Sequence, residues 1–293
     1  MKRRFLAALL SAGLFVANQS SRAATVQTLG AGSVVSSIDL LVTFDSLTAT
    51  NTMELGNYTE GGLSITTGSQ AWGADPNIIV TALYPFGGSI TPVAFYGIAN
   101  GAPEWVTIQT TNQAPMYGVE LMYGNTWSIY GTSWGNYEGY LVWQTLKNGT
   151  VISSGQVGPN PILPLGSIVG FFDPAGFDQL QVKCLIANSS PPNDQALALG
   201  SVSVQLTNRP PAPVIWGSDF SLDPVARVPA LTVYDTIAGC QYRLVYSETL
   251  PPPAWNAVTP TLPDGWQPGG GTLTFTDPGA AGRPRRFYCV QVR

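Results

Sequence analysis

Aromatic residues gather in one stretch of the sequence, between residues 116 and 143. Eight tyrosines and tryptophans fall within these 28 residues: Tyr117, Tyr123, Trp127, Tyr130, Trp134, Tyr137, Tyr140 and Trp143. Glycine directly follows Tyr117, Tyr123 and Tyr130, which leaves the faces of these rings open to a flat partner. A sugar ring has an apolar C–H face and a polar rim, so exposed aromatic rings with amide neighbours would suit it.

Trp127 and Trp134 are the first candidates for such stacking because they lie among glycines and serines, and Tyr137 is next. The full set of predicted ligand-binding residues is Trp127, Trp134, Tyr137, Tyr130, Tyr123, Trp72 and Asn136. Trp72 belongs to this set because it precedes a turn-like Gly-Ala-Asp-Pro segment. Large aromatic residues also fill β-sandwich cores, so we expect about half of the eight to be buried.

The chain contains no histidine, which limits the chemistry it can perform. This excludes a Ser-His-Asp triad, a Cys-His pair and any histidine-ligated metal. Paired carboxylates remain, and glycoside hydrolysis needs two of them. Glu138 with Glu120 or Glu104 would be the candidates, against the alternative that each is an ordinary solvated acid.

No metal site or other cofactor is predicted. The sequence has no Asp-x-Asp-x-Asp-Gly loop of the kind that binds calcium. Asp45, Asp173 and Asp178 could supply oxygen ligands to a structural calcium ion, but nothing in the sequence distinguishes them from aspartates in ordinary turns.

Charge divides the sequence into two parts. From residue 24 to residue 208 the cations are Lys147 and Lys183, against eleven acidic residues, which gives a net charge of −9. From residue 209 onward, seven arginines face six acidic residues, for a net charge of +1. An anionic, cation-poor part repels phosphate backbones, so we expect a neutral partner rather than nucleic acid or an anionic membrane.

Short β-branched and aromatic runs, interrupted every 8–12 residues by Gly, Pro, Asn or Asp, predict the secondary structure. This spacing is typical of β-sandwiches and barrels, so we expect an all-β fold. The clearest local prediction is a hairpin that joins residues 140–146 to 150–156 through Asn148-Gly149, because this pair tolerates the positive φ angles of a type I′ turn.

The first 23 residues have the layout of a secretory signal peptide. Lys2, Arg3 and Arg4 precede an apolar run over residues 5–17, and Ser21-Arg22-Ala23 places small residues at a cleavage site. We therefore expect a secreted or cell-surface protein whose mature chain has no membrane segment. The proline-rich residues 209–213 predict a linker between a larger domain, 24–208, and a smaller one, 214–293.

Three cysteines are present in the sequence. Cys240 and Cys289 flank the two best strands of the smaller domain, so we predict that they form a disulfide. Cys184 alternates with Val182 and Ile186, which predicts a buried, unreactive side chain.

Several segments of the larger domain resemble the jelly-roll β-sandwich domains of secreted bacterial proteins, a class that includes carbohydrate-binding modules. These segments are residues 42–45, 57–63, 146–150, 176–182 and 197–204. The resemblance implies an N-terminal jelly-roll sandwich. Related domains often have a calcium-binding Asp where this chain has Gly200, so the resemblance does not support a calcium site.

The smaller domain resembles a C-terminal module common in secreted proteins of Verrucomicrobia-like bacteria. The matching segments are residues 239–244, 247–250, 275–278 and 286–288, together with Trp255. The resemblance implies a small all-β accessory module for surface association. Taken together, these features predict a secreted protein that binds a neutral polysaccharide or cell-surface glycan by aromatic stacking. The alternatives are a glycoside hydrolase, and a structural surface or matrix protein whose aromatic residues are all core.

Overall fold

The computed structural model describes the greater part of the chain after residue 24. The described residues are 25–27, 34–44, 52–54, 57–67, 78–80, 84–86, 89–91, 94–96, 105–125, 139–160, 167–186, 194–195, 197–213, 215, 219–223, 225–252, 254–258, 264–281, 283 and 285–293. The predicted signal peptide lies outside them. Within these residues, no helix is long and apolar enough to cross a membrane.

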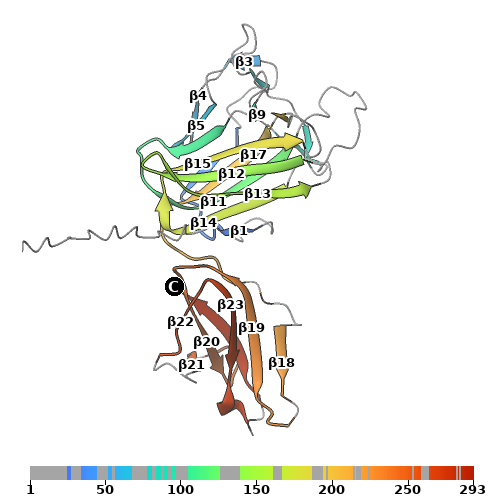
Figure 1. Cartoon of the computed structure of the whole chain (residues 1–293), viewed down its shortest axis with the longest axis vertical. Helices are drawn as coiled ribbons and strands as arrows, with labels where there is room; N and C mark the ends of the chain where they lie inside the picture. The colour runs from blue at the N-terminus through green and yellow to red at the C-terminus, as the bar shows by residue number, and fades with distance from the viewer. Residues whose placement is uncertain are drawn as a thin grey trace, which may run out of the picture.

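Two antiparallel sheets form the part of the molecule between residues 25 and 208, called the first region below (Figure 1). The six-stranded sheet has the order β1 (Thr25–Gln27), β14 (Ser167–Phe177), β11 (Met116–Asn125), β17 (Leu197–Gln205) and β2 (Leu40–Val42), with β9 (Ala94–Tyr96) also paired to β17. The seven-stranded sheet has the order β13 (Thr150–Asn160), β12 (Gly139–Lys147), β15 (Gln179–Ile186), β10 (Val106–Thr110), β5 (Leu63–Thr67) and β4 (Asn57–Glu60), with β16 (Asp194–Gln195) also paired to β15. Two smaller ladders pair β3 (Thr52–Glu54) with β6 (Ile78–Val80), and β7 (Tyr84–Phe86) with β8 (Ser89–Thr91).

The strand order of these two sheets is that of a jelly roll. One sheet contains the run β2-β17-β11-β14 and the other contains the run β10-β15-β12-β13. The chain changes sheet at each step between consecutive members of this set except at the β12–β13 hairpin. Interlocked Greek keys of eight strands produce this pattern, so the predicted all-β, jelly-roll class is confirmed.

Strand alternation builds the core between the two sheets. In β10, Val106, Ile108 and Thr110 are buried, while Thr107 and Gln109 point to the other side. The indole of Trp143 packs edge-on against Phe171 of the opposite sheet, with ring centroids 5.4 Å apart. These contacts hold the two layers of the sandwich together.

The predicted hairpin and the predicted buried cysteine are both present. Asn148 and Gly149 have φ angles of 50° and 73°, and Lys147 pairs with Thr150 across the turn. Cys184 is 3% exposed in the sandwich core, and burial raises the pKa of its thiol to about 12. A thiol this buried is unreactive at neutral pH.

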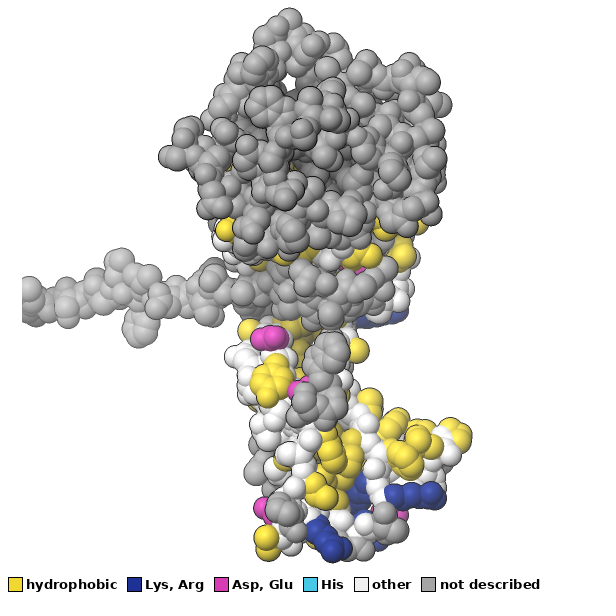
Figure 2. Space-filling view, turned by 90° about the vertical axis from the view of Figure 1, so that its right-hand side faces the viewer, with side chains coloured by type: hydrophobic (Ala, Val, Ile, Leu, Met, Phe, Trp, Pro, Cys, Tyr) yellow, Lys and Arg dark blue, Asp and Glu magenta, His cyan; other side chains and the backbone are white. Residues whose placement is uncertain are grey.

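A second, smaller pair of sheets, called the second region below, occupies residues 219–293. One sheet has the order β18 (Phe220–Leu222), β19 (Pro229–Thr236) and β23 (Gly271–Thr276). In the other, β20 (Gln241–Ser247) pairs with β21 (Asn256–Ala257), β22 (Gln267–Pro268) and β24 (Phe287–Val292). The 3-10 turn η3 (Pro278–Ala280) follows β23. Large apolar side chains are exposed in this region (Figure 2), including Phe220, Leu222, Val225, Tyr234 and Leu250.

The two regions share an apolar cluster. Val34 and Phe172 of the first region pack in one cluster with residues of the second region such as Leu231 and Tyr242. At the end of the first region, Gln205 donates hydrogen bonds to the carbonyls of Thr207 and Arg209 at 2.8 and 3.0 Å. The start of the predicted linker is therefore tied to the first region.

The predicted Cys240–Cys289 disulfide is wrong. In the β20–β24 ladder Cys289 lies opposite Val245, five positions along the strand from Cys240. At about 3.4 Å per residue this separates the two cysteines by roughly 17 Å, far beyond the distance of about 7 Å that a disulfide can bridge. Cys240 is also buried whereas Cys289 is exposed.

Candidate functional site

Most of the residues predicted to bind a ligand lie outside the described residues: Trp72, Trp127, Tyr130, Trp134, Asn136 and Tyr137. Tyr123 is described, and it is 4% exposed within the core of the first region. It alternates with Val119 and Leu121 on the inward side of β11. Its ring therefore has no open face for a ligand.

The strands that flank segment 126–138 lie in different sheets of the sandwich. Asn125, where β11 ends, pairs with Leu197 at the start of β17. Gly139, where β12 begins, pairs with Asn160 and Ile186, the last residues of β13 and β15. The segment that holds most of the predicted aromatic residues therefore joins the two sheets, and we call the end of the seven-stranded sheet at Gly139 the attachment edge.

A row of hydrogen-bonded amides crosses the outer face of the seven-stranded sheet, five residues along β12 from Gly139. Gln144 of β12 donates a hydrogen bond to Gln181 of β15, and Gln181 donates to the hydroxyl of Thr107 in β10 at 3.1 Å. Two positions further along, Gln179 donates to Gln109 at 3.0 Å. We call these five residues the amide face.

Two aromatic rings border the amide face on the side of the attachment edge. Trp105 precedes β10 and shares the outward side of the sheet with Thr107, and its ring lies 4.2 Å below the ammonium group of Lys183. Tyr140 of β12 is half-buried and has the same alternation as Gln144. The apolar run after Trp105 suggests that this residue is core, but the alternation of the strand places it on the outer face.

The amide face can bind uncharged polar groups. Each carboxamide has one acceptor oxygen and two N–H donors. The hydrogen bonds within the row leave the side-chain oxygens of Gln144 and Gln179 without a partner among the described residues. Half-buried amides held in fixed positions, with rings beside them, are a common way to recognise sugar hydroxyls and the apolar faces of sugar rings.

The acidic residues considered for glycoside hydrolysis do not meet at this face. Glu104 and Glu138 lie outside the described residues. Glu120 lies on the outer side of the other sheet, where its Oε1 accepts hydrogen bonds from the backbone N–H groups of Val34 and Val35 at 2.6 and 3.0 Å. Its carboxylate fixes this segment across β11.

The aspartates considered as calcium ligands bond the backbone where they are described. Asp173 accepts a hydrogen bond from the backbone N–H of Ala175 at 2.8 Å, and Asp178 accepts one from that of Asn148 at 2.7 Å. Asp45 lies outside the described residues. No group of three acidic or cysteine side chains that could hold a metal ion occurs in the described part of the chain.

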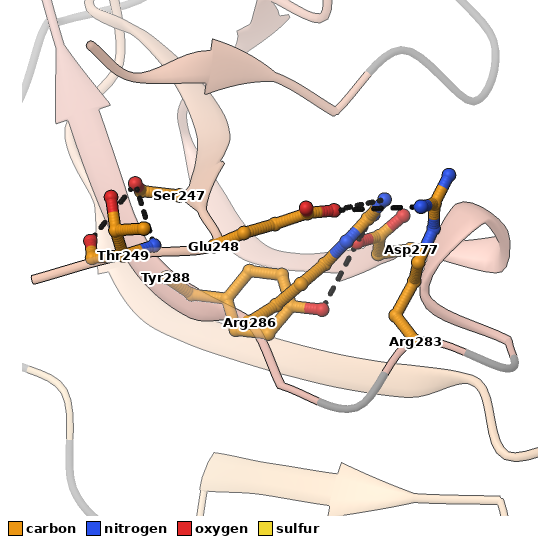
Figure 3. A network of polar contacts seen from close by, with 7 residues as sticks. All are labelled: Ser247, Glu248, Thr249, Asp277, Arg283, Arg286 and Tyr288. Atoms are coloured by element: carbon orange, nitrogen blue, oxygen red, sulfur yellow. Dashed lines mark hydrogen bonds and ion pairs between the residues drawn. The ribbon is translucent and has the colours of Figure 1, made fainter. Parts of the chain in front are cut away.

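A second polar cluster lies at one end of the second region (Figure 3). The guanidinium of Arg286 bonds the buried carboxylate of Asp277, and the hydroxyl of Tyr288 donates to the same carboxylate oxygen at 3.0 Å. Burial and the bond to Asp277 raise the pKa of Tyr288. Burial disfavours the charge of Arg286, but Asp277 outweighs this effect and raises the Arg286 pKa. The cluster joins β23 to β24 and has the character of a structural ion pair.

Comparison with known proteins gives little further information. No family model and no curated protein matches the chain. A solved structure of the CBM32-1 and CBM32-2 domains from Clostridium perfringens ZmpB, in complex with GalNAc, matches 93% of this chain and 96% of its own length, with 9% identity and a TM-score of 0.31. The glycoside hydrolase domain of Endo-D from Streptococcus pneumoniae R6 matches 78% of this chain and 36% of its own length, with 8% identity and a TM-score of 0.17. At these TM-scores the two matches establish neither a common fold nor a common ligand.

Sequence reasoning missed the amide face for an identifiable reason. Glutamines and threonines alternate with apolar residues in β10, β12 and β15, and this alternation is visible in the sequence. Their meeting depends on the register, which pairs Gln144 with Gln181 and Gln181 with Thr107. The strand order of the sheet was the missing signal.

Proposed function

We propose that this protein is exported and binds a neutral polysaccharide or cell-surface glycan across the amide face. The observation that carries the proposal is the row Gln144–Gln181–Thr107, which offers fixed, uncharged hydrogen-bonding groups on an outer sheet face. The rings of Trp105 and Tyr140 extend this surface toward the attachment edge. The net charge of −9 in this part of the chain is consistent with a neutral ligand.

Segment 126–138 is the proposed source of further stacking. It is followed in the sequence by Gly139 and by Tyr140, which borders the amide face. Trp127 and Trp134 would stack on sugar rings, and the amides would bind their hydroxyl groups. In this proposal the second region is an accessory module that supports or tethers the glycan-binding region.

Affinity electrophoresis of the full chain through gels that contain neutral polysaccharides tests the proposal. We expect Trp127→Ala and Trp134→Ala each to weaken retention by about tenfold or more, because tryptophans dominate such binding sites. Gln181→Ala removes the central amide and should cost about fivefold. Trp255→Ala, an exposed tryptophan of the second region, is the matched control and should leave retention unchanged.

Unchanged retention in all three variants of the first region would contradict this site. If the protein releases reducing sugar from a glycan and the Glu138→Gln variant does not, the function is hydrolysis and not binding alone. Failure of every neutral glycan to retard the protein would favour a structural surface or matrix protein. Export is tested separately by expression in a bacterial host and N-terminal sequencing, with cleavage expected after Ala23.

A further inference from the structure

Two arginines and a tryptophan meet on the outer face of the β20–β24 sheet. Gln241 and Arg293 exchange backbone hydrogen bonds of 2.8 and 3.0 Å, so their side chains lie on the same side of neighbouring strands. Trp266 directly precedes β22, which pairs with the start of β20. The guanidinium carbons of Arg243 and Arg293 lie 4.5 and 4.2 Å from the centroid of the Trp266 ring.

Each of the two guanidinium groups is held in place by a hydrogen bond from its own Nε atom. Nε of Arg243 donates a hydrogen bond to Gln291 at 2.7 Å, and Nε of Arg293 donates to Gln241 at 2.8 Å. A guanidinium has five N–H donors, so each group keeps its two terminal nitrogens for other partners. These two nitrogens form a planar fork that matches the two oxygens of a carboxylate.

The positive charge at this face is only partly neutralised. Arg286, which lies elsewhere in the second region, is by contrast paired: it bonds a buried carboxylate, and its side chain is 6% exposed. Arg243 forms no ion pair with any described residue. Arg293 has Asp264 at 4.0 Å, but the two side chains are 56% and 60% exposed, so water and salt screen this pair. Two cations held beside one ring repel each other, and a bound anion would relieve that repulsion.

We propose that this Arg243–Trp266–Arg293 face binds the carboxylate groups of an acidic polysaccharide. A single exposed arginine–carboxylate contact is weak in water, so the ligand must present several carboxylates, as a polyuronate does. Gln241 and Gln291 lie on the same face and suit the hydroxyl groups of such a chain. The proposal does not depend on the neutral-glycan site of the first region.

Native affinity electrophoresis of the full chain in polygalacturonate gels tests this face. We expect the double variant Arg243→Gln/Arg293→Gln to lose affinity by about tenfold or more, because both forks are removed. The double variant Arg227→Gln/Arg285→Gln is the matched control, since it removes two exposed arginines elsewhere in the region. The affinity of the control variant should stay within about twofold of that of the natural protein, because the control changes the net charge but leaves the proposed face intact. Trp266→Leu should weaken binding by about threefold, since both guanidiniums lose their contact with the ring.

Three results would overturn the proposal. These are unchanged retention of the Arg243→Gln/Arg293→Gln variant, an equal loss in the control variant, and retardation by dextran sulfate as strong as that by polygalacturonate. The second result would mean that net charge alone governs retention, and the third would mean a general cation-exchange surface. Retention of the same variants on neutral polysaccharides reports on the first region, so failure of one site is distinguishable from failure of the other.

Discussion

The two regions hold their acidic side chains in different ways. In the first region, most of the described carboxylates that bond the backbone accept hydrogen bonds from N–H groups that lie far away in the sequence, Asp173 being an exception. Glu120 bonds Val34 and Val35, and Glu60 bonds the N–H groups of Thr43 and Phe44 at 3.1 Å each. These bonds fix connecting segments against the sheets.

In the second region, arginine is the usual partner. All ion pairs found among the described residues lie there, and they join Asp277 and Glu248 to Arg286, Glu248 to Arg283, and Asp264 to Arg293. Asp223 shows that the backbone pattern also occurs in this region, because the N–H groups of Ala226 and Val225 lower its pKa. Which pattern dominates follows from the supply of cations in each region.

A cation-poor sandwich can bury a carboxylate by pairing it with backbone N–H groups. Two lysines and eleven acidic residues cannot form enough ion pairs, so backbone donors replace guanidinium groups. A backbone N–H bonded to a buried carboxylate fixes the path of the chain as well as satisfying the charge. An arginine partner instead leaves a second buried charge that depends on the first.

The largest effect is expected from Asp277→Ala. This substitution leaves the buried Arg286 guanidinium without its carboxylate and should lower the free energy of unfolding by about 3–5 kcal/mol. Hydrogen–deuterium exchange of the full chain should show the loss of protection in β23 and β24. Asp264→Asn removes an exposed ion pair but keeps an acceptor for the backbone N–H of Trp266, and it should cost less than about 0.5 kcal/mol. Similar losses of stability in both variants would show that burial does not determine how much these ion pairs stabilise the protein.

Glu120→Ala should have the next largest effect, in the first region. It leaves the N–H groups of Val34 and Val35 without their acceptor and should lower the free energy of unfolding by about 2–3 kcal/mol. Urea denaturation measures the loss, and amide exchange at these two residues locates it. Glu120→Gln keeps an acceptor oxygen and should cost about half as much. If Gln and Ala cost the same, the negative charge, and not the acceptor oxygen, holds the segment.

Alkaline pH should lower the free energy of unfolding of the two regions through different groups, because each region buries its own weak acid. The pKa of the Cys184 thiol rises from its ordinary value of 9.0 to about 12 because the group is buried. Between these values the unfolded chain releases the proton and the native chain keeps it, so the free energy of unfolding falls as pH rises. The loss should reach about 2 kcal/mol near pH 10.5, at about 1.4 kcal/mol per pH unit.

Cys184→Ala provides the control for this pH dependence. Urea denaturation at pH 7 and at about pH 10.5 should show a smaller alkaline loss in this variant than in the natural protein. Burial also raises the pKa of Tyr242 and of Tyr288, so the second region should keep its own loss above pH 10. An identical pH dependence in both proteins would exclude Cys184 as its source.

Thr145→Val should give the smallest effect, and it should stabilise. The Thr145 hydroxyl is buried in the first region and has no hydrogen-bond partner among the described residues. Its replacement by a methyl group should raise the free energy of unfolding by about 0.5–1 kcal/mol. Thr110→Val is the matched control, because the Thr110 hydroxyl donates to the carbonyl of Ala114 at 2.8 Å. That variant should lose about 1 kcal/mol, and a gain in both would show that a satisfied hydroxyl is no better than a valine here.

Local features of the sequence predicted a substantial part of this molecule. The alternation and turn residues indicated an all-β fold, and Asn148-Gly149 specified a hairpin because few residue pairs adopt two successive positive φ angles. The alternation around Cys184 predicted its burial for a similar reason. Each of these predictions depends on residues close together in the chain.

Features that depend on residues far apart in the sequence could be read only from the tertiary structure. Alternation assigns Gln144, Gln181 and Thr107 to one side of their strands, but only the strand order makes them neighbours. The same limit explains the error for Cys240 and Cys289, whose strands do pair, but in a register that keeps the two thiols apart. A strand sequence encodes two faces with a period of two residues, whereas the choice of partner and register is made by the packing of the whole sandwich.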